Sequence, residues 1–104
     1  MSLDHVFSAL ADPTRREVVE TLLRDGETSV PALTGRLPMT RQAVAKHLAA
    51  LDEAGLVTRR PGKGREVRWA LRPGALKPAS AWLHDAEAAW DRRLERLKDV
   101  VERG

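Results

Sequence analysis

The chain is 104 residues long, and its 18 Lys and Arg outnumber its 15 Asp and Glu, which gives a net charge of +3. This length suits one domain with a modest core, for which a second copy would help to bury apolar surface. Because cysteine is absent, disulfides and thiolate metal sites are excluded. No apolar run approaches the roughly 20 residues that span a membrane, and Asp4 and His5 interrupt any signal peptide. We expect a soluble, cytoplasmic protein whose basic pI of about 9.9 permits nucleic-acid binding.

Two helices are predicted in the first 26 residues. The first has a short apolar stripe, made of Leu3, Val6, Phe7 and Leu10. Asp12 followed by Pro13 is typical of a helix start, with Asp as the N-cap and Pro at the first helical position. The second helix therefore begins here and ends at Gly26. Its inward-facing residues are expected to be Val18, Val19, Leu22 and Leu23.

A short extended segment and a third helix are predicted next. Residues 27–30 are expected to lie extended beside a later hairpin, and residues 31–37 to form the third helix, weakened by Gly35. Pro38 and Met39 make the turn into a fourth helix. Thr40 suits the N-cap of that helix, and Gly55 suits its end, where a left-handed residue is needed.

The fourth helix, residues 41–54, has two unlike faces. One is an apolar stripe at spacings of four and three, made of Val44, Leu48 and Leu51. The other carries Arg41, Gln42, Ala45, Lys46 and Ala49. Small residues on this face let the backbone approach a partner closely, and Arg, Gln and Lys can reach base edges and phosphates in a DNA major groove. We therefore predict a recognition helix, although an ordinary solvated helix would also have a polar face.

A basic β-hairpin is predicted over residues 56–71. A β-prone run at 56–60 is followed by a turn at 61–64, and residues 66–71 alternate as the second strand. One acid stands against five basic residues, which are Arg59, Arg60, Lys63, Arg65 and Arg68. A solvated hairpin could carry this charge for solubility alone, but such clusters commonly bind phosphate.

These elements together predict a winged helix-turn-helix, a mainly α fold with one small β-hairpin. The third and fourth helices form the helix-turn-helix, and the hairpin is the wing. The whole chain, 1–104, is one domain in this interpretation. The residues expected to contact DNA are Thr40, Arg41, Gln42, Ala45, Lys46, Arg60, Lys63 and Arg65.

A long last helix is predicted over residues 75–101, with an apolar stripe about 39 Å long on an otherwise charged surface. The first 71 residues cannot easily cover that length, so we expect the terminal helices to pair in a two-fold homodimer. Packing against the first helix of the same chain is the alternative, and both can occur together. The residues expected at the dimer interface are Val6, Phe7, Leu76, Leu83, Ala86, Trp90, Leu94 and Leu97.

Three segments resemble the ArsR-type winged-helix repressors: residues 9–16, 39–48 and 51–57. The resemblance covers nearly the whole chain and keeps the family's order. It implies a dimeric bacterial transcriptional regulator with the order α-α-α-α-β-β-α, whose fourth helix enters the major groove while the hairpin follows the flanking backbone. The last helix, with Trp82, Leu83, Trp90 and Leu94, resembles a subgroup that often lacks the metal-sensing sites.

Metal sensing is the alternative that the family raises. His84 and Glu87 lie three residues apart on the last helix and could share a metal with Asp4 or His5 of a second copy. The family's C-terminal site also needs an Asp and a His earlier in the chain, where this sequence has Leu71 and Pro73. We therefore predict no metal site and no cofactor, and the effector stays unidentified.

Catalysis is not expected. No nucleophile and base form a recognisable motif, and the glycines at 62 and 64 lie between strands, in a loop too short to cradle phosphate. The prediction is a sequence-specific DNA-binding transcriptional regulator, a repressor that binds an inverted-repeat operator as a homodimer. A metal-responsive repressor and a winged-helix module for protein–protein contacts stay open as alternatives.

Overall fold

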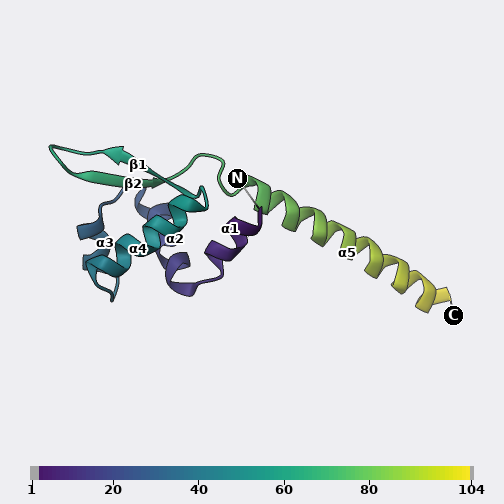
Figure 1. The fold of residues 1–104 in the computed structure, drawn as a ribbon. Coiled ribbons are helices and arrows are strands. Elements are labelled where there is room, and N and C mark those ends of the chain that lie inside the picture. Colours follow the sequence, from purple (N-terminus) through teal and green to yellow (C-terminus); the bar gives the residue numbers. More distant parts are fainter. Residues whose placement is uncertain (1–2, 104) are drawn as a thin grey trace.

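The computed structural model describes residues 3–103. Five helices and one hairpin follow each other in the order predicted for a winged helix-turn-helix (Figure 1). Their bounds are α1 (Leu3–Leu10), α2 (Pro13–Asp25), α3 (Val30–Arg36), α4 (Arg41–Glu53), β1 (Val57–Pro61), β2 (Val67–Leu71) and α5 (Lys77–Arg103). The predicted bounds differ mainly at the hairpin turn, because Pro61 belongs to β1, and at α5, which begins and ends two residues later than expected.

Three helices begin at the side-chain caps that the sequence offers. The carboxylate of Asp12 accepts a hydrogen bond from the Thr14 amide at 2.8 Å, and this bond is the main reason that the pKa of Asp12 is lowered. Ser29 caps α3 through the Ala32 amide, and Thr40 caps α4 through the Ala43 amide at 3.1 Å. These bonds satisfy amides that the first turn of a helix leaves free, so the starts of α2, α3 and α4 are fixed locally.

The core lies between α1, α2, α3, α4 and the hairpin. Its largest fully buried side chains include Leu22, Leu33, Leu48, Leu51 and Leu56. The apolar stripe predicted for α4 is therefore confirmed as core. Burial of these side chains supplies the main favourable free energy for packing the helices together.

The prediction that Leu23 faces inward is wrong, because 60% of this side chain is exposed. Successive helical residues point about 100° apart, and Thr21, three residues after buried Val18, takes the inward position instead. The hydroxyl of Thr21 donates to the Glu17 carbonyl at 2.9 Å, so this polar side chain is satisfied in the core.

The hairpin is antiparallel, and its register runs from the pair Val57 and Leu71 to the pair Pro61 and Val67. Thr28 adds an isolated bridge to the outer edge of β2, where its amide and carbonyl exchange hydrogen bonds of 3.0 and 2.7 Å with Trp69. The extended segment expected at 27–30 is thus reduced to this bridge. It ties the hairpin to the loop between α2 and α3.

The molecule consists of a compact head and a protruding α5 (Figure 1). Its extents are 70 × 25 × 21 Å and its radius of gyration is 18.8 Å, whereas a compact chain of this length would have about 13 Å. The start of α5 packs on α1, where Phe7 and Trp82 meet edge to face with ring centroids 5.8 Å apart. The rest of α5 extends away from the head.

Candidate nucleic-acid interface

The fourth helix presents its predicted polar face to solvent. Val44, Leu48 and Leu51 are fully buried on the opposite side, against α2 and α3. The exposed residues of α4 and its cap include Thr40, Arg41, Gln42, Ala45 and Lys46. Arg41 and Lys46 form no ion pair with any of residues 3–103, so both cations are available to an anionic partner.

The small residue Ala45 lies within this face, between longer side chains. Because it adds little bulk, the helix axis can come close to a partner surface while Arg41, Gln42 and Lys46 reach past it. Thr40 sits at the first turn, where the free amides of a helix N-terminus favour an anion. This arrangement fits the floor and phosphate walls of a DNA major groove.

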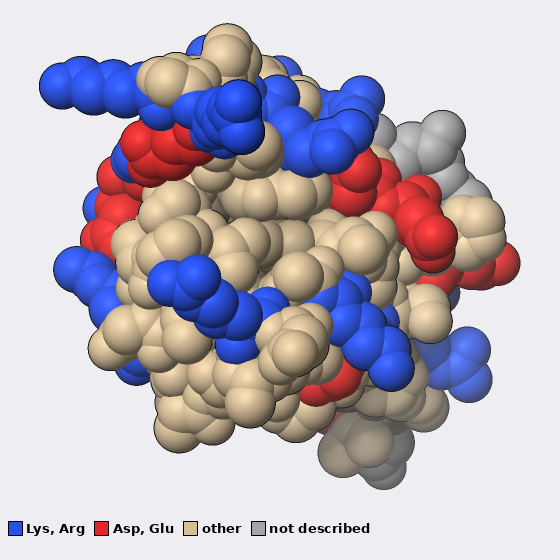
Figure 2. All heavy atoms as spheres, turned by 60° about the vertical axis from the view of Figure 1, so that its left-hand side comes forward, with Lys and Arg blue, Asp and Glu red and all other residues tan. Residues whose placement is uncertain are grey.

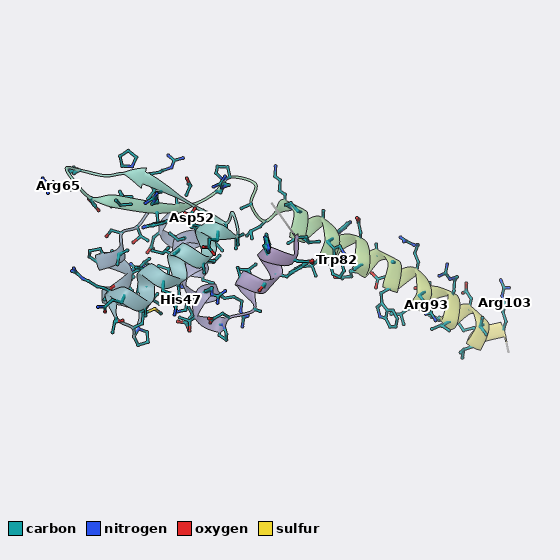
Figure 3. All side chains as sticks on the ribbon, in the orientation of Figure 1. His47, Asp52, Arg65, Trp82, Arg93 and Arg103 are labelled. Atoms are coloured by element: carbon teal, nitrogen blue, oxygen red, sulfur yellow. The ribbon has the colours of Figure 1, made fainter. Side chains whose placement is uncertain are left out.

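The five basic residues of the hairpin are not equivalent. Lys63 and Arg65 lie at the exposed turn and pair with no acid within the described part of the chain, and Figure 3 places Arg65 at the hairpin tip. The guanidinium of Arg59 lies 5.9 Å from the centroid of the Trp69 ring, a cation–π contact. The positive charge of the tip is therefore uncompensated.

The strand residues next to the turn are partly neutralised instead. Glu27, in the loop after α2, lies 3.7 Å from Arg60 Nε and 3.8 Å from Arg68 Nε. Arg68 also donates to Glu66 at 2.9 Å and to the Glu27 carbonyl at 3.0 Å. The sequence predicted Arg60 as a DNA contact and gave the Glu27 side chain no part in the site. The signal for Glu27 was weak, namely a lone acid at the start of the segment expected beside the hairpin.

The recognition helix and the wing tip share one end of the head, remote from α5 (Figure 1). Figure 2 brings that end forward: basic side chains gather along the top, where the hairpin lies, and others lie below across a band of uncharged surface. Two separated groups of cations with a neutral band between them suit a duplex that is held at its backbone and read in between.

The apolar stripe of α5 is largely uncovered. About half of the surface of Leu83, Trp90, Leu94 and Leu97 is exposed, and Ala86 beside them is exposed as well. Phe7 and Leu76 are half-buried against their own core. Val6 is only 1% exposed, so it packs inside the protomer and we remove it from the expected interface.

The described residues offer neither a metal-binding cluster nor a membrane-spanning helix. Within residues 3–103, no three His, Cys, Asp or Glu side chains lie close enough together to hold a metal ion in one protomer. None of the helices in that range has the length and apolar character needed to cross a membrane. His84, exposed on α5, therefore belongs to no such group within that range.

Comparison with known proteins identifies the family. Residues 10–60 match the model of a helix-turn-helix domain. The HTH-type transcriptional regulator Rv2034 of Mycobacterium tuberculosis is 38% identical over 97% of this chain and 90% of its own length, and the arsenical resistance operon repressor of Escherichia coli is 32% identical over 92% and 79%. The structure of an ArsR-like transcriptional regulator from Rhodococcus sp. RHA1 is 42% identical, with a TM-score of 0.79 over 94% of this chain and 91% of that one. This chain belongs to the ArsR family of winged helix-turn-helix proteins and is a DNA-binding transcriptional regulator, not an enzyme.

Proposed function

We propose that the protein is a repressor that binds an inverted-repeat operator as a homodimer. Two separate surfaces carry this proposal. The first is the exposed polar face of α4, called the reading face, whose cations have no ion pair within residues 3–103. The second is the exposed apolar stripe of α5, called the seam, made of Leu83, Trp90, Leu94 and Leu97. The first surface suits DNA, and the second suits another copy of the chain. A dimer that covers a promoter blocks polymerase by occupancy, and the DNA target implies a cytoplasmic location.

In the proposed complex, α4 lies in the major groove. Gln42 can pair with the N6 and N7 edge of adenine, and Arg41 can contact guanine or a phosphate. Lys46, one turn further along, reaches the same groove or its wall, while Thr40 and Ala45 let the helix N-terminus and backbone come close.

The wing holds the flanking backbone in this proposal. Lys63 and Arg65 lie at the exposed turn and Arg60 lies on β1, so all three can approach phosphates beside the groove that α4 occupies. Contacts to phosphate carry no sequence information, but they fix the register of the protein on the duplex.

The seam on α5 brings two heads together. A helix of 27 residues is about 40 Å long, and pairing with a second copy would cover Leu83, Trp90, Leu94 and Leu97 on both chains. Two copies of α4 about 34 Å apart would then meet successive major grooves of an inverted repeat. We keep Phe7, Leu76 and Ala86 in the proposed interface.

The reading face is tested with Gln42→Ala and Lys46→Ala on an operator found by mapping bound genomic DNA. Both side chains are exposed, so folding stays intact. Loss of a good base contact costs about 1–3 kcal/mol at the operator and less on random DNA. Lys77→Ala, an exposed lysine at the start of α5, is the charge-matched control and leaves affinity unchanged. Equal losses on both DNAs would mean that the residues position the protein and do not read bases.

The wing is tested by its salt dependence. The double substitution Lys63→Ala, Arg65→Ala is expected to weaken binding to all sequences alike and to lower the slope of log affinity against log salt by roughly one to two units. An unchanged slope would rule out phosphate contact at the tip. If the DNA affinity of the native protein did not change with salt concentration, a protein partner would be favoured instead.

A further inference from the structure

Two arginines stand directly opposite each other on the hairpin. Arg60 on β1 pairs with Arg68 on β2 in the register, so both side chains leave the same face of the ribbon. Like charges in this arrangement destabilise a strand pair. Glu27, an acid from outside the hairpin, offsets this repulsion because its carboxylate contacts both guanidinium groups.

The position of Glu27 is built into the fold. Gly26, at a φ of 82°, turns the chain out of α2, and the next residue after Glu27 is Thr28, whose two backbone hydrogen bonds to Trp69 hold the loop against β2. The loop therefore places a carboxylate beside the Arg60–Arg68 pair of the wing without depending on the ion pairs themselves.

The two arginines are held with different strength. Arg68 donates two hydrogen bonds, to the Glu66 carboxylate at 2.9 Å and to the Glu27 carbonyl at 3.0 Å, and it forms an ion pair with the Glu27 carboxylate at 3.8 Å. Within residues 3–103, Arg60 has only the Glu27 carboxylate as an anionic partner, at 3.7 Å, beyond hydrogen-bond distance, and 56% of its side chain is exposed. Arg60 is thus the cation that can leave Glu27 while Arg68 stays in place.

We propose that Glu27 stands in for a DNA phosphate: its carboxylate holds Arg60 in the free protein, and a backbone phosphate takes its place when DNA binds. This inference rests on the proposed function and adds a residue that sets its strength. Ion pairs between exposed side chains are weak, so exchange of one anion for another is easy. The competition lowers affinity for every DNA sequence alike, because phosphate contacts do not distinguish bases.

The test begins with Glu27→Gln, which keeps the shape of the side chain and the Thr28 bridge but removes the charge. Affinity for both operator and random DNA is expected to rise roughly two- to fivefold, the range that a broken exposed ion pair allows. The salt slope is expected to steepen by up to about one unit. In the native protein, DNA binding would free the Glu27 carboxylate to take up a cation, and the variant has no carboxylate to do so. Glu27→Asp, with a shorter reach toward Arg60, should give a smaller gain.

A double-mutant cycle separates this exchange from a general charge effect. In an Arg60→Ala background, the gain from Glu27→Gln is expected to vanish, since Arg68 stays held by its two hydrogen bonds and no cation is left to release. Glu66→Gln is the matched control. It also removes one negative charge beside the hairpin strands, but Glu66 pairs with Arg68 and not with Arg60, so the effect of Glu66→Gln stays equal with and without Arg60.

Three outcomes would overturn the inference. A gain that persists without Arg60 would mean long-range charge alone, and a loss of affinity together with a lowered melting temperature would make Glu27 a structural clamp. Unchanged affinity in Glu27→Gln, while Lys63→Ala, Arg65→Ala still lowers the salt slope, would refute the exchange and leave the proposed function standing. If the native protein bound no DNA in a salt-dependent way, the proposed function itself would fall.

Discussion

The head and the protruding helix α5 differ in how far they bury their leucine side chains. Leu22, Leu33 and Leu48 are at most 2% exposed in the head, whereas Leu83 and Leu97 on α5 are about half exposed. The head therefore finds enough apolar partners within its own chain, and α5 does not. A continuous apolar stripe left in water marks an interaction surface, so the second copy that we propose would cover α5 more than the head.

The strongest test of this difference between the head and α5 is to place charged side chains in the seam. Leu83→Glu with Trp90→Glu puts unpaired charge into the proposed apolar interface, at a cost of several kcal/mol. The protein should become monomeric, and operator binding should collapse, because one half-site supplies only half of the contacts. Sedimentation at matched concentrations measures the first effect, and titration of the operator measures the second.

Arg92→Glu is the matched control for charge. Arg92 lies nine residues from Leu83, about 180° around the helix, so the same change of two charges falls on the opposite face. Its dimer should persist. An intact dimer of the Leu83→Glu, Trp90→Glu variant would refute the seam, and a folded head in a monomeric variant would support the independence of the two regions.

Within the head, adjacent leucines give the next largest effect. Leu22 is 2% exposed and Leu23 is 60% exposed on the same turn of α2. Leu22→Ala should cost about 2–5 kcal/mol of unfolding free energy through lost burial and a cavity, whereas Leu23→Ala should stay within about 0.5 kcal/mol. Denaturant unfolding at one fixed protein concentration measures both, since dimerisation makes stability depend on concentration. Equal costs would mean that α2 is turned differently on the core.

Local signals explain why the order of elements could be predicted from the sequence. Thr40 and Asp12 cap their helices through amides two or three residues away, and Gly55 takes a positive φ of 77° where α4 ends. Such signals act within one turn, so they can be identified without knowing the fold. The spacing of Val44, Leu48 and Leu51 set the two faces of α4 in the same way.

The wrong or missing predictions from the sequence concern side chains whose burial or contacts depend on tertiary packing. Residue type alone favoured Leu23 over Thr21 for the core, but the neighbours of α2 and a satisfied hydroxyl decided otherwise. Glu27 contacts Arg60 and Arg68, which follow it in the sequence by 33 and 41 positions, so no local pattern predicts these contacts. The burial of Val6 likewise depends on how α1 lies on the rest of the head.

The smallest expected effect lies on α5, at His84. Its own chain brings no group of three ligating side chains together within residues 3–103, and without cysteine the chain has no thiolate to complete a site between copies. His84→Ala should therefore change neither dimerisation nor operator affinity, with zinc or with a chelator present. Sedimentation and operator titration under both conditions measure this. A zinc-dependent loss of operator binding in the native protein that His84→Ala abolishes would instead establish a metal site shared across the seam, and α5 would then carry the regulatory signal as well as the dimer contact.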